Sequence, residues 1–95
     1  SQNYPNPFNP VTYIQYSVPY YDYITMDIIN LNGQIIRTIF NNFHQPGHYE
    51  IMWDAINNQG MSVPSGIYFY KMTGANFMLI KKLILLTFLN LILII

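Results

Sequence analysis

Hydrophobic and polar residues alternate with a period of two through most of the chain. The alternating stretches predict β-strands at residues 12–18, 23–30, 34–40, 48–53, 67–73 and 77–86. Residues 54–66 are rich in turn formers and leave room only for a very short strand near Ser62-Val63. Six or seven short strands, with a helix conceivable only in the C-terminal tail, predict an all-β sandwich.

Turn signals separate the predicted strands. Pro19 ends the first strand, and Asn32-Gly33 favours a tight hairpin between the second and third because both residues tolerate a positive φ. Asn41 to Gly47 is predicted as a loop, marked by Pro46-Gly47, and Gly74 to Asn76 as the turn before the last strand. These short connections suit antiparallel neighbours.

The alternation also assigns faces to the strands. In the second strand, Ile24, Met26 and Ile28 share one face, whereas Thr25 and Asp27 lie on the other. The apolar face of the fourth strand consists of Tyr49, Ile51 and Trp53. These apolar faces are the predicted core.

Residues 1–11 form a different kind of segment. Prolines at 5, 7 and 10 fix φ, remove backbone donors and push each preceding residue toward extended geometry. We expect a stiff lead-in, with Tyr4 and Phe8 packed on the sandwich. The predicted division is therefore a lead-in (1–11), a sandwich domain (12–86) and an apolar extension (87–95).

Composition narrows the classes of function. The chain has 95 residues, enough for one domain of modest stability, and only 8% are charged. Net charge is zero and the cations form no basic stripe, so nucleic-acid binding has no support. Cysteine is absent, which excludes disulfides and thiolate chemistry. No secretory signal peptide opens the sequence, so an exported form would carry one on a longer precursor.

The polar residues give no pattern typical of a metal site. His44 and His48 are four apart, but Pro46-Gly47 between them forbids the helix that would align them. The segment from Asp54 to Gly60 lacks the alternating carboxylates and closing glutamate of a calcium loop. We predict a polar turn there, with Asp54 capping backbone N–H groups.

No catalytic set is visible either. The acidic residues are Asp22, Asp27, Glu50 and Asp54, and Asp27 and Glu50 lie at strand positions facing away from the apolar side. No nucleophile with a base and an orienting group can be assembled, and no glycine-rich phosphate loop is present. We expect a protein without enzymatic activity, cofactor or metal.

Trp53, Tyr68, Phe69 and Tyr70 allow two interpretations. They would suit an aromatic platform for a carbohydrate, or a core of large rings. The core interpretation is favoured, because large rings dominate the cores of small sandwiches and alternation turns half of them inward.

The C-terminal tail from Leu83 to Ile95 is apolar apart from Thr87 and Asn90. As a helix it would reach only about 20 Å, short of the roughly 30 Å hydrocarbon core, so no stable membrane span is expected. Leu83 to Leu86 is predicted to complete the last core strand. Residues 87–95 would pack as a strand or helix, or come from a shifted reading frame; exposed, they would be prone to aggregation.

Five blocks, in order, resemble one family. They are Gln2 to Pro10, Ile28 to Gln34, the Pro46-Gly47 and Trp53-Asp54 pair, Gly60 to Lys71, and Lys81 to Leu86. Together they resemble the C-terminal sorting domain of proteins exported by the type IX secretion system of Bacteroidetes-like bacteria. The Trp53-to-Lys71 part is also similar to the immunoglobulin-like domain of flagellar hook-capping proteins. The family's motif positions are Tyr4, Pro5, Asn6, Pro7, Phe8, Asn9, Pro10, Gly33, Trp53, Asp54, Gly60, Gly66, Tyr68 and Tyr70.

The resemblance implies a seven-stranded immunoglobulin-like sandwich that serves as an address label. Such a domain follows a covalently joined cargo, is recognised by the outer-membrane translocon, and is commonly removed by a sortase-like peptidase. The product is secreted or held at the cell surface. The positions implied in recognition are Lys81, Lys82, Leu83, Leu85 and Leu86.

Lys81-Lys82 has a second, compatible interpretation as a charged break that protects an edge strand from pairing. The alternative for the whole chain is an immunoglobulin-like structural or adhesive module, either hook-cap-like or carbohydrate-binding.

Two departures from the family pattern stand out. Ala55 follows Trp53-Asp54 where the family usually has glycine, a mild change only if the turn avoids a positive φ. The chain also continues through residues 87–95 beyond the family's usual finish. If the translocon recognises a free C-terminus, this extension is expected to impair export.

Overall fold

The computed structural model describes residues 11–86, which form six strands and no helix. The strands are β1 (Thr12–Val18), β2 (Asp22–Ile29), β3 (Ile35–His44), β4 (Gly47–Trp53), β5 (Gly66–Thr73) and β6 (Met78–Leu85). The predicted all-β fold is confirmed. The strand count is six where about seven were expected, because Ser62 makes only an isolated bridge to Ile56. The Asn57–Gly60 turn precedes it and Pro64, without an N–H, follows it.

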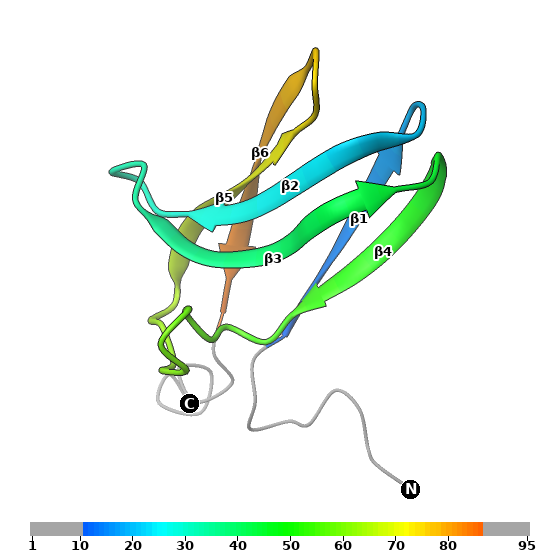
Figure 1. The fold of residues 1–95 in the computed structure, drawn as a ribbon. Coiled ribbons are helices and arrows are strands. Elements are labelled where there is room, and N and C mark those ends of the chain that lie inside the picture. The colour runs from blue at the N-terminus through cyan, green and yellow to red at the C-terminus, as the bar shows by residue number, and fades with distance from the viewer. Residues whose placement is uncertain (1–10, 87–95) are drawn as a thin grey trace, which may run out of the picture.

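The six strands form two antiparallel sheets (Figure 1). The smaller sheet pairs β1 with β4, and the larger has the order β3-β2-β5-β6. The chain passes between the sheets after β1, β3 and β4, and forms hairpins between β2 and β3 and between β5 and β6. This connectivity leaves β6 at one edge of the larger sheet.

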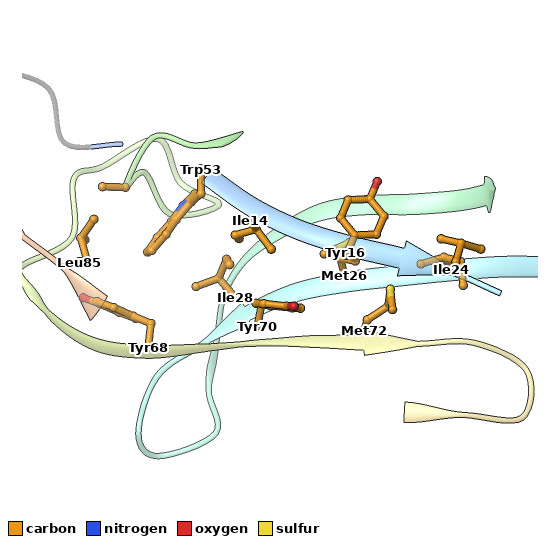
Figure 2. Close-up of a cluster of buried hydrophobic side chains, with 12 residues drawn as sticks. Ile14, Tyr16, Ile24, Met26, Ile28, Trp53, Tyr68, Tyr70, Met72 and Leu85 are labelled. Atoms are coloured by element: carbon orange, nitrogen blue, oxygen red, sulfur yellow. The ribbon is translucent and has the colours of Figure 1, made fainter. Parts of the chain in front are cut away.

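The core lies between the two sheets (Figure 2). Ile24, Met26 and Ile28 are fully buried, as the alternation in β2 predicts. On β4, Trp53 is buried while Tyr49 and Ile51 are half-buried. The remaining buried hydrophobic residues are Ile14, Tyr16, Val18, Ala55, Tyr68, Tyr70, Met72 and Leu85. The predicted inward faces are therefore confirmed.

The predicted hairpin between β2 and β3 is present, but of Asn32 and Gly33 only the glycine has a positive φ. Gly33 has φ +80° and its N–H donates to the Asn30 carbonyl at 3.0 Å. The Asn30 side-chain oxygen also accepts hydrogen bonds from the backbone of Asn32 and Gln34. Asparagine and glycine thus satisfy the turn locally.

The predicted loop at residues 41–47 is wrong. β3 continues to His44, and Asn41 and Asn42 pair in register with Thr25 and Ile24 of β2. Thr25 donates its side-chain hydrogen bond to Asn41 at 3.0 Å, so a residue that favours loops is held in the ladder by a cross-strand partner. Only the two residues between β3 and β4 remain as a connection.

Residues 1–10 and 87–95 lie outside the described residues. The predictions about the lead-in, including the packing of Tyr4 and Phe8, and about the extension therefore remain predictions, as do the motif positions from Tyr4 to Pro10. Among residues 11–86 there is no helix long and apolar enough to cross a membrane.

The turn after Trp53 does not avoid a positive φ. Ala55 has φ +63° and is 1% exposed. A left-handed conformation costs an L-residue roughly 1–2 kcal/mol, whereas glycine adopts it freely. The glycine that the resemblance leads us to expect here would fit this backbone, and the alanine keeps the conformation at an energetic cost.

We predict that Ala55→Gly changes the free energy of unfolding by less than about 1 kcal/mol, because relief of the left-handed strain offsets the loss of a buried methyl worth ~0.8 kcal/mol. Ala55→Val should destabilise by about 2–4 kcal/mol, since a β-branched side chain suits neither this φ nor the filled space. Urea unfolding of the two variants measures both effects. Equal stability of the valine and alanine proteins would contradict the positive φ.

Candidate functional site

The residues predicted for recognition gather on the last described strand. Lys81, Lys82, Leu83 and Leu85 belong to β6, and Leu86 follows it directly. β6 pairs with β5 along eight consecutive register positions without an irregularity. No other strand of residues 11–86 pairs with β6. The candidate site is therefore an edge strand. Within the described part of the chain, no other strand covers its outer edge.

The two lysines point to opposite faces of the sheet. Lys81 pairs with Tyr70, a buried core residue, so it lies on the inward side of β6. Lys82 pairs with Phe69 on the outward side. The sequence prediction treated the two as one pair. The period of two that predicts the strand also separates them, and this signal was available in the sequence.

Each face of β6 combines one lysine with aliphatic residues. The inward face holds Leu79, Leu83 and the buried Leu85. The outward face exposes Met78, Ile80 and Ile84, at 60%, 47% and 59%, and Leu86 beyond the strand is 64% exposed. A solvated strand face normally carries more polar residues, so this outward surface is unusually apolar.

A hollow of about 260 Å³ adjoins Lys81. Residues of both sheets line it: Gln15, Tyr16, Ser17, His48, Tyr49, Tyr70, Leu79 and Lys81. At this point the sheets are joined by the Tyr70 hydroxyl, which donates to the Gln15 carbonyl at 3.3 Å. Lys81 is the only lysine, arginine or carboxylate in the lining and places a positive charge at the hollow.

The motif aromatics are structural. Trp53 packs edge-on against Tyr68, with ring centroids 5.3 Å apart. Figure 2 shows both side chains within the core cluster. The indole N–H donates to the Ile56 carbonyl at 3.1 Å, and the Tyr68 hydroxyl donates to the Pro64 carbonyl at 2.7 Å. Because Trp53, Tyr68 and Tyr70 are all buried, the core interpretation is confirmed for these three rings and a carbohydrate platform made of them is excluded. Phe69 is half-buried on the outward side of the sheet and is not part of this core.

The prediction that Asp54 caps the following turn is wrong. Asp54 instead accepts a hydrogen bond from the Arg37 guanidinium at 3.3 Å, and the same nitrogen donates to the Ile56 carbonyl at 2.9 Å. The cap is Asn57, whose side-chain oxygen accepts from the backbone N–H groups of Gln59 and Met61. Arg37 reaches this turn from β3, a long-range contact that local sequence does not reveal.

Each of the two histidines makes its own polar contact with a residue of β1. His44 Nε2 lies 2.8 Å from the Tyr16 hydroxyl, and His48 Nδ1 lies 2.7 Å from the Ser17 hydroxyl. Tyr49 stacks on Tyr16 and also contacts the His44 ring. Sequence reasoning missed this cluster because it placed His44 in a loop. Among residues 11–86, no three histidine or acidic side chains lie close enough to hold a metal.

Burial raises the pKa of three tyrosines, Tyr16, Tyr68 and Tyr70, above the ordinary value of 10.0. The neighbouring Tyr49 adds to the shift in the pKa of Tyr16. Desolvation disfavours the phenolate, so the folded protein retains protons that the unfolded chain releases. The stability that this provides is complete below about pH 10 and is lost as pH rises through the raised pKa values.

We therefore predict that the free energy of unfolding falls above about pH 10. Tyr68→Phe should cost about 1 kcal/mol near neutral pH, because the Pro64 carbonyl loses its donor. The difference in the free energy of unfolding between this variant and the parent should become smaller at high pH, since phenylalanine does not ionise. Urea unfolding across the pH range measures both slopes. Parallel slopes would show that Tyr68 does not titrate with unfolding.

Comparison with known proteins identifies the sandwich. A family model described as the FlgD Ig-like domain matches residues 20–76, from the turn before β2 to the turn after β5. The matched segment contains the Trp53–Tyr68 contact and the turn between them, whereas β1 and β6 lie outside it. Neither the curated proteins nor the solved structures gave a match. Since the model covers more than half of the chain and the fold agrees with it, this protein belongs to the FlgD Ig-like domain family.

Proposed function

We propose that this Ig-like domain is a non-catalytic C-terminal sorting domain that directs a covalently joined cargo across the outer membrane through type IX secretion. Its partners are then the translocon and a sortase-like peptidase, and the cargo is secreted or held at the cell surface. The observation that carries the proposal is the position of β6. In the block that resembles the family's finish, Lys81 to Leu85 lie on β6 and Leu86 follows it. Among residues 11–86, β6 is an edge strand that pairs only with β5.

The roles of the carboxylates support a non-enzymatic function. Asp22 accepts from the Ala75 backbone at 3.0 Å, and Asp27 accepts from the Thr38 hydroxyl at 2.6 Å. Asp54 pairs with Arg37, and Glu50 accepts from Gln15 across the β1–β4 ladder. Each acidic side chain therefore holds two elements of the described fold together.

A structural or adhesive module is the second candidate, favoured by one surface. Tyr21 and Phe43 stack with centroids 5.5 Å apart, and Tyr23 meets Phe43 edge-on at 5.0 Å. All three side chains are exposed. Exposed rings of this kind suit contact with another protein or a sugar, without any role in export.

Placement within a larger protein separates the candidates. In a host with type IX secretion, a reporter with a Sec signal peptide would carry either the full chain or residues 1–86. The added chain would stand at the C-terminus of the reporter or between its two halves. The proposal expects reporter outside the outer membrane only when the chain is terminal. Equal delivery of the reporter from both placements would favour the adhesive module. Failure of export from both placements would also favour it, if the isolated domain binds to the cell surface and Tyr21→Ala and Phe43→Ala abolish that binding.

A further inference from the structure

The edges of the two sheets differ in how far the described residues cover them. Along β3, the Asn58 N–H donates to the Ile36 carbonyl at 2.9 Å and the Asn58 side chain accepts from the Thr38 N–H at 3.1 Å. On β1, the Gln15 carbonyl accepts from Tyr70. Among residues 11–86, no backbone hydrogen bond outside the β5 ladder involves a residue of β6. β6 is thus the less covered of the two edges of the larger sheet.

β6 is also the most regular edge of the larger sheet. Its eight positions pair with β5 without a shift, whereas the pairing of β2 with β3 shifts after Met26 and after Ile28. Bulges and short strands are the usual protections of an edge against pairing. β6 has neither, and its polar protection consists of two adjacent lysines.

The charge around this edge is uncompensated. Residues 66–86, which contain β5 and β6, include three lysines and no acidic residue. Lys71 lies opposite Asp27 in the β2–β5 ladder. Lys81 and Lys82 have no such neighbour, and the only ion pair among residues 11–86 joins Arg37 to Asp54. The edge is therefore positive at its centre, with aliphatic side chains toward both ends.

This arrangement disfavours a second copy of the chain as the occupant. Two β6 strands paired antiparallel about a two-fold axis near their centres would place either Lys81 opposite Lys81 or Lys82 opposite Lys82 of the other copy. Like charges directly opposite each other destabilise a strand pair. A partner strand of opposite charge meets no such penalty.

We infer that the edge of β6 that no other strand of residues 11–86 pairs with is a docking site for an extended segment of another protein that carries two adjacent acidic residues flanked by apolar ones. Successive side chains of a strand alternate between faces, so two neighbouring carboxylates would meet Lys81 on the inward side and Lys82 on the outward side. Apolar neighbours would cover Ile80 and Ile84, which are exposed. The inference rests on the proposed function only in assigning the partner to the export machinery.

The test uses the full 95-residue chain and a synthetic peptide, Thr-Val-Thr-Val-Glu-Glu-Val-Thr-Val-Thr. We expect this peptide to slow amide hydrogen exchange in β6 and to bind at least ~tenfold more tightly than the same peptide with a Lys-Lys centre. Added salt should weaken the acidic peptide's binding, because exposed charge pairs are screened.

Matched variants decide whether the edge lysines are responsible. Lys81→Glu with Lys82→Glu should reverse the preference between the acidic and basic peptides. Lys71→Gln, which removes a charge from the central strand β5, should leave the preference unchanged. If the double reversal does not fold, Lys81→Gln with Lys82→Gln should abolish the preference.

Three results would overturn the inference: equal affinity for both peptides, protection confined to β1, β3 or β4, or self-association of the chain through β6. Because the test is made with the isolated chain, peptide binding can be observed even if export fails, and export can be observed even if the peptide does not bind. Peptide binding without any export would count against the proposed function alone.

Discussion

Trp53→Ala is expected to leave the domain largely unfolded. The indole is 1% exposed, packs against Tyr68 and gives its N–H to Ile56. Removing a buried aromatic side chain costs about 3–5 kcal/mol, which is comparable with the whole stability of a small domain. Urea unfolding, monitored by circular dichroism, would measure the loss of stability. The stability of Trp53→Phe should lie between that of the parent and that of Trp53→Ala, because phenylalanine keeps a ring.

Met52→Ala is the matched control for this change. Met52 is the neighbour of Trp53 on β4, but its side chain points away from the core and is 37% exposed. We expect a loss of less than about 1 kcal/mol. If Trp53→Ala were no more destabilising than Met52→Ala, the core assignment shown in Figure 2 would be wrong.

The second large effect is expected on export and not on stability. Lys81→Glu combined with Lys82→Glu should reduce the exported fraction of a fused reporter at least ~tenfold, because an acidic partner strand would then face like charges. Both side chains are exposed, so the fold should persist. Reporter activity in the medium and in the periplasm measures the effect.

Lys71→Gln again serves as the control, since it removes a lysine from the interior of the same sheet. Its export should match that of the parent. Unchanged export of the double reversal, with the fold verified by circular dichroism, would remove β6 from the recognition step. Equal loss in the control and the double reversal would point to net charge and not to the edge.

The strands and the core could be predicted because they follow local rules. Alternation identifies β2 and its buried face, and the Asn-Gly turn fixes the hairpin that follows it. The failures come from contacts between distant residues. Asn41 and Asn42 favour loops in isolation, yet pairing with β2 extends β3 through them. Arg37 draws Asp54 away from the capping role that its position suggests.

The candidate site was predictable in composition but not in arrangement. The resemblance points to Lys81 and Lys82, and the period of two already implies that they face opposite sides. That β6 is an edge strand depends on the strand order β3-β2-β5-β6, which alternation does not determine. The docking role proposed for β6 therefore rests on the strand order and not on the sequence alone.

The most direct test of the central claim is the delivery of a reporter by this domain. A reporter with a Sec signal would be fused to residues 1–95, to residues 1–86, or to no domain, in a type IX-competent host and in the same host without its translocon. The account predicts extracellular reporter with at least one of the two domain fusions, only where the translocon is present. Export by residues 1–86 alone would identify residues 87–95 as inhibitory. Reporter confined to the periplasm with both fusions would contradict the account.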